Sequence, residues 1–368
     1  MATMVLAVLM APTNSQAQAV SEPSASRDHP RLEVNLGGIG YDTSELSSAR
    51  WQTFTDFIDA DHLAVAWLST RKRNAAHSGE PTSLHVLVLD IRTGEKTGLD
   101  SYATPLGAVR FAGVSDGAFL TCTGGLLRIW SKEFKQLREK KLSDDHGCGG
   151  FGALGVSPSR KLLLLSLSRK PGQSAPKTLL NLETFSTDAE WTEDCSGLAT
   201  SDHYLIGRCG KAHTLFVRSL DQGWQPFQSV PDRVGSVSFV ADDVLAFGTK
   251  NQVVVTTVAG KQLFTASLPG RNIAMHFATS IRGDRFAVLE GESRGIRSAP
   301  LDMYPFLSQD RVAVYSLRDR RAIFALNLKG TSPWAPGLIR LNQVALSPDG
   351  TLLTVLSGGV LRVYRLPQ

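Results

Sequence analysis

The 368-residue sequence has no hydrophobic run long enough to cross a membrane. Its first apolar stretch, Met4 to Ala11, is eight residues long, whereas a transmembrane helix needs about 20. No later segment approaches that length without charged residues. We therefore expect no transmembrane segment.

The first residues are typical of a secretory signal. The apolar stretch is followed by polar residues and by Ala17-Gln18-Ala19, a pattern after which signal peptides are cut. No Lys or Arg precedes the stretch, so either the true start lies upstream or the signal is weak. The alternative is a disordered cytosolic tail. We expect residues 1–19 to be a signal peptide, residues 20–30 a flexible Ser/Pro linker, and the protein to be secreted or periplasmic.

Cysteine is scarce, and the even number of four suits an oxidising compartment. Cys195 and Cys209 flank a segment whose turn centres near Asp202, so a hairpin would place them opposite each other. We expect a disulfide between these two. Cys122 and Cys148 form either a second bridge or two separate buried thiols.

Motifs for catalysis, cofactors and metals are also missing. There is no P-loop, no dinucleotide fingerprint and no H-E-x-x-H, so nothing indicates a cofactor. Residues 144–148 contain two Asp, a His and a Cys, but no second Cys/His pair completes a zinc site. Two stretches fit G-x-S-x-G, at 113–117 and 291–295, yet neither leads into a helix as a hydrolase elbow requires.

The charge is modest and dispersed. The formal charge is +5, and Lys and Arg are spread along the whole chain. Nucleic-acid binders usually concentrate such charge in a stripe, and no module that reads or stacks bases is evident. We therefore expect no nucleic-acid partner, while another anionic partner is permitted. Apolar residues make up 42% of the chain, which is enough for a well-buried core.

Helical periodicity is absent, and a repeat of short strands takes its place. The turns that join first to second strands centre near Asp61, Asp116, Ser159, Asp202, Asp242, Gly283 and Asp349. Four of the six intervals are 40 to 43 residues. Each turn precedes an almost continuous apolar strand, then a third and usually a fourth strand rich in β-branched and aromatic residues. The Lys- and Glu-rich segment 131–141 occupies the place of a third-to-fourth strand turn, so we expect a hairpin there.

Seven units of this length with four strands each predict a β-propeller. The last unit, "LSPDGTLL" followed by "VLRVYRL", resembles a blade of the WD40-like and YVTN-type β-propeller superfamily. The segment "LDIRTGE" at 89–95 is similar to the third-strand exit turn of those families. The Gly-His and Trp-Asp signatures of WD40 repeats are absent, with only "RIWS" at 128–131 near the second, which leaves the subfamily open.

The predicted fold is all-β, a single seven-bladed β-propeller of four-stranded blades over residues 31–368. The chain ends after the third strand of its last unit, which would leave an open sheet edge. The segment Arg31 to Gly38 reads as a strand and belongs to no unit. We expect Leu32 to Leu36 to form the outer strand of the last blade and so to close the ring.

The three longest inserts would emerge on one face of this ring, because each joins a second to a third strand. The expected binding residues on that face are Arg71, Arg73, Arg169, Lys170, Arg294, Arg297, Tyr304 and Trp334. Lys72 and Lys177 add to its positive charge. Residues in or beside first strands, which either face the central channel or cap it, are Arg110, His276 and Arg340.

We favour an exported, monomeric binding module that uses this basic face. Clustered positive charge with aromatic residues suits an acidic protein surface, an anionic glycan or a small anionic ligand. The opposing interpretation is that the loops are solvated and their charges aid solubility. The alternative function is a propeller enzyme, lactonase- or glycosidase-like, at the mouth of the channel. The sequence contains no recognisable nucleophile motif that would support this alternative. Two carboxylates about 5 to 9 Å apart at the mouth of the channel would support it.

Overall fold

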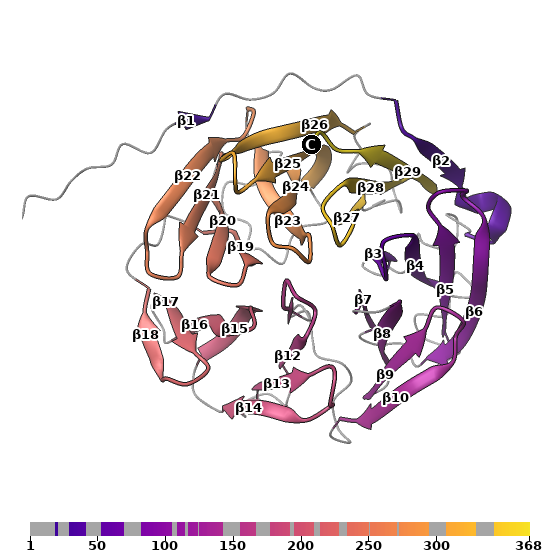
Figure 1. Ribbon diagram of the computed structural model, residues 1–368, viewed down its shortest axis with the longest axis horizontal. Helices are drawn as coiled ribbons and strands as arrows, with labels where there is room; N and C mark the ends of the chain where they lie inside the picture. The colour runs from indigo at the N-terminus through magenta and orange to yellow at the C-terminus, as the bar shows by residue number, and fades with distance from the viewer. Residues whose placement is uncertain are drawn as a thin grey trace, which may run out of the picture.

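The computed structural model describes residues 19–20, 29–41, 53–69, 82–104, 109–114, 117–123, 125–142, 155–166, 177–191, 195–209, 214–227, 234–249, 251–270, 272–293, 307–328 and 342–368. In this part of the chain seven antiparallel sheets stand around a central channel (Figure 1). The predicted seven-bladed β-propeller is therefore confirmed.

Four strands make up each blade, counted here from the channel outward. Blade 1 contains β3 (Thr53–Phe57), β4 (His62–Ser69), β5 (Thr82–Asp90) and β6 (Lys96–Thr104). Blade 2 contains β7 (Arg110–Gly113), β8 (Ala118–Thr123), β9 (Leu126–Ser131) and β10 (Gln136–Lys141). Blade 3 contains β11 (Gly155–Val156), β12 (Leu162–Ser166), β13 (Lys177–Asn181) and β14 (Thr187–Trp191).

The remaining four blades follow the same order. Blade 4 contains β15 (Cys195–Thr200), β16 (Tyr204–Cys209), β17 (Thr214–Ser219) and β18 (Trp224–Pro226). Blade 5 contains β19 (Ser236–Ala241), β20 (Val244–Thr249), β21 (Gln252–Thr257) and β22 (Gln262–Ser267). Blade 6 contains β23 (Asn272–Thr279), β24 (Arg285–Ser293), β25 (Leu307–Ser316) and β26 (Arg321–Asn327). Blade 7 contains β27 (Gln343–Leu346), β28 (Leu352–Ser357), β29 (Val360–Arg365) and β2 (Leu32–Asn35).

The second strand of a blade is covered on both faces, which explains its continuous apolar sequence. Every residue of β8 and of β20 is buried. The core lies between neighbouring blades: one cluster combines Phe264 of blade 5 with Phe286 and Tyr315 of blade 6. The rings of Phe286 and Tyr315 stack with centroids 5.2 Å apart. Each blade is therefore stabilised chiefly by packing against its neighbours.

The two ends of the described propeller meet in blade 7. The strand β2 pairs antiparallel with β29, with Leu32 opposite Val363 and Val34 opposite Leu361. Leu36 follows β2, begins the short 3-10 helix η1 (Leu36–Ile39) and is fully buried. The predicted closing strand is confirmed, and it ends one residue earlier than expected.

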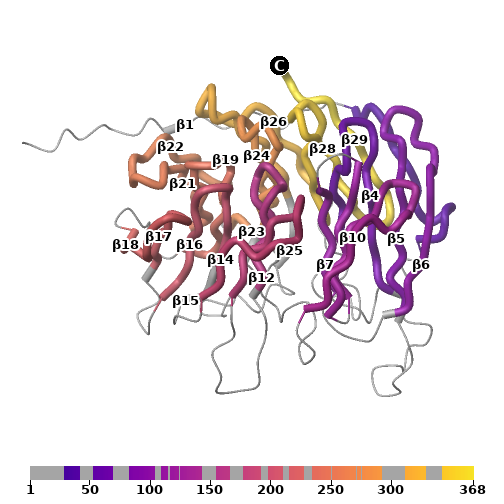
Figure 2. The backbone as a smooth tube through the Cα atoms, turned by 60° about the horizontal axis from the view of Figure 1, so that its bottom comes forward, coloured from indigo at the N-terminus to yellow at the C-terminus, as the bar shows by residue number. Residues whose placement is uncertain are grey.

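The strands run between two faces of the ring (Figure 2), which we name by the connections they carry. The turn face carries the turns from first to second strands, and the insertion face carries the connections from second to third strands. The predicted turn centres fall between first and second strands, apart from Asp116, which lies outside the described residues. The hairpin predicted at 131–141 is confirmed, with a turn between β9 and β10.

A fifth strand joins blade 5. The strand β1 (Ala19–Val20) pairs parallel with β22, the outer strand of that blade (Figure 1). Apart from residues 19–20 and 29–30, the expected signal peptide and linker lie outside the described residues. No helix in the described part of the chain has the length and hydrophobicity to span a bilayer.

Candidate functional site

The central channel forms a hollow with a volume of about 500 Å³, lined by described residues. All seven innermost strands contribute to its wall, so its lining is drawn from every blade. One lining residue from each blade, in chain order, is Asp56, Gly113, Val156, Thr200, Ser238, His276 and Val344. A ligand in the channel would therefore contact residues from distant parts of the sequence.

A salt bridge joins blades 1 and 3 at the turn-face end of this channel. Arg160, in the first turn of blade 3, donates from Nη2 to Asp56 Oδ1 of blade 1 at 2.7 Å. The other guanidinium nitrogen, Nη1, donates to the carbonyl of Phe57. The second carboxylate oxygen of Asp56 accepts a hydrogen bond from the backbone N–H of Gly113 at 2.8 Å. The Asp56 carboxylate thus binds the backbone of blade 2 at Gly113 and the charged side chain of Arg160 in blade 3.

Gly113 provides the room for this crossing. A Cβ at this position would overlap the Phe57 carbonyl oxygen and lie 2.5 Å from Arg160 Nη1. The carbonyl belongs to the backbone of β3, so it has little freedom to move away. The guanidinium can therefore pass over blade 2 only because residue 113 has no side chain.

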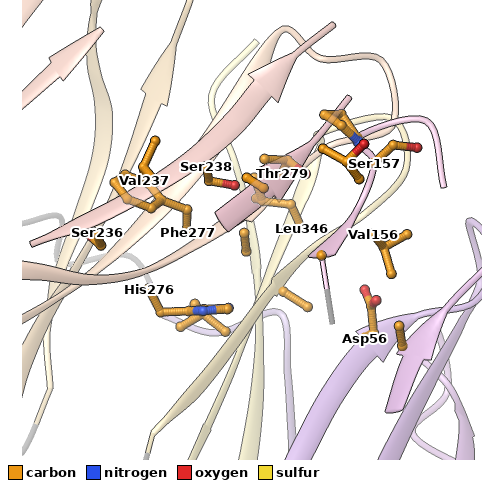
Figure 3. Close-up of a pocket in the computed structure, with 18 of the residues that line it drawn as sticks. Asp56, Val156, Ser157, Ser236, Val237, Ser238, His276, Phe277, Thr279 and Leu346 are labelled. Carbon is orange, nitrogen blue, oxygen red and sulfur yellow. The ribbon is translucent and has the colours of Figure 1, made fainter. Parts of the chain in front are cut away.

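His276 of β23 is one of the residues that line the channel (Figure 3). The pairing of β23 with β24 shifts register between Ala274 and His276, a bulge that re-aims the following side chain. The imidazole is exposed to the channel, yet the surrounding blades restrict its hydration and lower its pKa, while Asp56 acts to raise it. A neutral imidazole at neutral pH follows, which can both donate and accept a hydrogen bond.

The turn face is linked from blade to blade by side chains of its turns. Ser159 of blade 3 donates to Asp202 of blade 4 at 2.5 Å. The next contact joins His203 Nδ1 of blade 4 to Asp242 of blade 5, also at 2.5 Å. Arg285 of blade 6 donates to the carbonyl of Gly350 in blade 7 at 3.0 Å. These contacts fix the first turns of neighbouring blades relative to one another.

A buried ion pair lies near the insertion-face ends of β24 and β25. Arg311 Nη1 donates to both carboxylate oxygens of Glu290 at 3.1 Å, and Asn272 donates to the same carboxylate at 3.5 Å. Glu290 is fully buried and the Arg311 side chain is 8% exposed. The three residues come from β23, β24 and β25, so the charge is compensated within one blade.

The residues predicted to bind a partner lie outside the described residues, as do Lys72 and Arg340. This set consists of Arg71, Arg73, Arg169, Lys170, Arg294, Arg297, Tyr304 and Trp334. Lys177 was expected to add to this charged face, and that expectation is wrong. It is the first residue of β13 and is buried, because pairing with Ser166 and Trp191 extends the sheet through it.

Two of the three channel candidates are described. His276 is among the residues that line the channel. Arg110 is the first residue of β7 and is half-buried; burial lowers its pKa, and it donates to the Val109 carbonyl at 3.4 Å. Its neighbour Phe111 lines the channel. The sequence reasoning missed Asp56 and Arg160, because nothing local to either residue indicates their contact.

The cysteines follow the sheet of blade 4. Cys195 of β15 lies directly opposite Cys209 of β16 in the strand register. Cys209 and Cys122 are both disulfide-bonded, and no cysteine is a free thiol among the described residues. The strand register supplies the proximity that a disulfide between Cys195 and Cys209 requires. The pairing itself stays a prediction.

Metal-binding and hydrolase motifs find no site in the described part of the chain. No three His, Cys, Asp or Glu side chains gather there as a metal ion would need. The candidate cluster 144–148 lies outside the described residues. Gly113 ends the strand β7 and Gly291 lies within β24, so neither G-x-S-x-G stretch begins at a strand-to-helix turn.

The sequence matches no protein-family model and no curated protein. Solved structures do match it. A chain in the crystal structure of a mitotic checkpoint complex is 16% identical, with a TM-score of 0.53 and full coverage of both chains. The C-terminal WD40 domain of Sif2 is 12% identical over 86% of this chain and 97% of that one, with a TM-score of 0.46. Hsv2 of Kluyveromyces lactis is 12% identical over 86% and 98%, with a TM-score of 0.47. At such identities the first similarity shows the fold alone, and the other two are too distant to add to it.

Proposed function

We propose that this WD40-like β-propeller is an exported interaction module that binds an anionic partner through its insertion face. The chain has the WD40-like fold, with seven blades around one channel. Because one fold carries many functions, the proposal rests on the site and not on the fold.

The main support for the proposal is the distribution of net positive charge along the sequence. The strand ends define the three inserts as residues 70–81, 167–176 and 294–306. Together they contain seven Lys or Arg and two Asp or Glu, a net charge of +5. The whole chain also carries +5, so the remaining residues are neutral in sum. The excess positive charge therefore belongs to connections that open on one face.

The described strands give these inserts fixed ends. The flanking residues are paired in register in all three cases: Ser69 with Ser83, Ser166 with Lys177, and Ser293 with Leu307. In blade 6 the buried pair of Glu290 and Arg311 lies on β24 and β25, the two strands that the insert connects. Binding residues on loops anchored to a rigid scaffold lose less conformational entropy when a partner binds.

Export is the part of the proposal that the first 19 residues support. A signal cut after Ala19 would deliver the chain to an oxidising compartment, which suits its disulfide-bonded cysteines. N-terminal sequencing of the protein recovered from the cell envelope, with Val20 expected as the first residue, tests it. Recovery of an uncut chain from the cytosol would overturn it.

No observation in the described channel favours the enzyme alternative. Asp56 is the one carboxylate in the described lining, and Arg160 and Gly113 occupy its two oxygens. Glycoside hydrolysis needs a second carboxylate at a defined separation. The described channel lining therefore does not supply the two carboxylates that a glycosidase-like mechanism needs.

Affinity capture from envelope extract tests the binding face. The variant carries Glu at Arg71, Arg73, Arg169 and Lys170. A matched control carries Glu at Lys96, Lys135, Lys161 and Lys261, which are exposed outside the inserts, so both proteins undergo the same charge change. We expect a partner that the parent and the control retain, that the insert variant loses, and that salt weakens.

Two outcomes would overturn the binding proposal. A partner lost equally by both variants would show that net charge alone attracts it. No partner for the parent would point to a small ligand, and the next screen would measure lactone and glycoside turnover. Thermal unfolding of all three proteins would show that the substitutions leave the fold intact.

A further inference from the structure

The outer strands of the seven blades differ in how their edges are protected. An exposed edge pairs readily with another strand, and charged residues or proline at the edge discourage this. Six outer strands carry such a residue within their bounds: Glu33 in β2, Lys96 in β6, Arg138 in β10, Asp188 in β14, Pro226 in β18 and Arg321 in β26. The strand β22, with the sequence QLFTAS, carries neither.

The unprotected edge is also the one that the chain pairs with an additional strand. The strand β1 lies parallel to β22, with Ala19 opposite Thr265 and Val20 opposite Ala266 (Figures 1 and 2). Blade 5 is thereby a five-stranded sheet, while the other described blades have four. The absence of edge protection and the presence of a fifth strand are independent observations on the same strand.

We propose that the outer edge of blade 5 is a strand-addition site and that the N-terminal segment of the same chain, at Ala19–Val20, occupies it. Strand addition draws its affinity from main-chain hydrogen bonds, so an occupant needs an extended backbone more than a particular side chain. The strand β1 supplies such an extended backbone. In Figure 1 β1 and β2 lie on the same rim, on either side of β26.

Cleavage of the signal peptide would change whether the edge of β22 is covered by β1. A cut after Ala19 removes the residue opposite Thr265 and leaves Val20 as the first residue of the chain. The uncut chain covers its own edge, whereas the cut chain presents β22 to another extended peptide. This site is on the rim of blade 5 and does not depend on the insertion face.

Hydrogen–deuterium exchange of the full chain tests the occupancy. Ala19→Pro removes one N–H donor from β1 and disfavours its pairing, while the control Ala25→Pro introduces the same residue outside β1. We expect the amides of β22 to exchange roughly tenfold faster in A19P than in the parent or in A25P. The amides of β10, an outer strand with no added strand, should be unchanged and serve as the internal reference.

A second experiment tests the edge itself. A labelled peptide with the sequence of residues 14–24 should bind A19P about tenfold more tightly than the parent, because the parent carries a competing segment. Thr265→Lys on the A19P background should abolish binding, and Thr187→Lys, a matched change on β14, should not.

Three results would overturn the inference. The first is an exchange rate of β22 that A19P leaves unchanged. The second is equal peptide binding by the parent and A19P. The third is protection of β22 that falls on dilution, which would show that a second copy supplies the strand. The four-residue charge variant of the insertion face should leave the exchange of β22 unchanged, so failure here is distinguishable from failure of the proposed function.

Discussion

Arg160 and Asp56 are 104 residues apart in the sequence, and their side chains meet at 2.7 Å across the neighbouring blade. The backbone of Arg160 has a φ of 65°, in the left-handed region that residues other than glycine rarely occupy. This conformation costs roughly 1–2 kcal/mol, which the contacts to Asp56 and Phe57 offset. The pair therefore acts as a tie between blades 1 and 3.

Replacing Arg160 with glycine separates the energetic cost of the left-handed backbone from the stabilisation by the side-chain contacts. Glycine accepts the backbone conformation, so relief of strain favours the variant, while loss of the guanidinium leaves Asp56 without its charged partner. We expect a net loss of about 1–3 kcal/mol in the free energy of unfolding, measured by chemical denaturation. Arg320→Gly is the matched control, because Arg320 has a φ of 53° and is exposed. Equal or greater stability of R160G would contradict the role of the tie.

Gly113→Ala should destabilise the fold by about 2 kcal/mol or more, because the added methyl group overlaps the Phe57 carbonyl. Gly223→Ala serves as the control, since a Cβ there meets nothing within 4 Å. If the unfolding curves shift equally for the two variants, the backbone around Gly113 can move to accommodate the methyl group, and the prediction is wrong.

Deleting residues 31–37 should strongly destabilise the propeller and promote its aggregation. The deletion removes β2 and the buried Leu36, and it exposes the edge of β29. Loss of a fully buried leucine alone costs about 2–5 kcal/mol. Thermal unfolding and light scattering measure both effects, with Glu33→Gln, which leaves the strand β2 in the chain, as the control. A deletion variant that melts like the parent would show that β2 does not close the ring.

Peptide mapping by mass spectrometry under non-reducing conditions should find Cys195 linked to Cys209. Their positions are opposite each other on β15 and β16, and Cys209 is disulfide-bonded. The linked peptide should disappear after reduction. A link from Cys209 to another cysteine would refute the pairing.

The contact between His203 and Asp242 should make stability depend on pH. The hydrogen bond and charge of Asp242 raise the pKa of His203. Stabilisation is therefore fully present below the unfolded pKa of about 6.5 and is lost as pH rises through the folded pKa. Burial acts to raise the pKa of Asp242, and hydrogen bonds from His203 and Ser201 lower it on balance, so the carboxylate stays charged across this window.

His203→Gln tests this dependence. The melting temperature of the parent should exceed that of H203Q at about pH 5.5, and the difference should shrink by about pH 8.5. The His203 side chain is 72% exposed, so the effect should stay below about 1 kcal/mol. His29→Gln, at an exposed histidine, is the control. If the difference in melting temperature between the parent and H203Q does not change with pH, the contact between His203 and Asp242 is not its cause.

The fold could be predicted from the sequence because its turns are built from local chemistry. In the last blade Asp349 accepts hydrogen bonds from Ser347 Oγ and from the Thr351 N–H, and Gly350 has a φ of 71°. Residues within five positions of one another therefore encode that turn. The closing strand followed from the same reasoning, since an open edge on the last blade requires a partner.

The channel contacts could not be predicted in this way. The pairing of Asp56 with Arg160 depends on the curvature of the ring and on a left-handed backbone at Arg160, and neither has a local signal. The orientation of His276 depends on a bulge, which the apolar pattern of β23 does not reveal. The binding residues of the inserts stay predictions from composition and topology.

The closure of blade 7 has a consequence for the order in which the protein is made. Glu33 and Arg362 form a salt bridge at 2.8 Å although 329 positions separate them. A ribosome must therefore synthesise β27, β28 and β29 before the first strand of the ring finds its partner. Until then every nascent chain is an open arc of blades, with β2 unpaired.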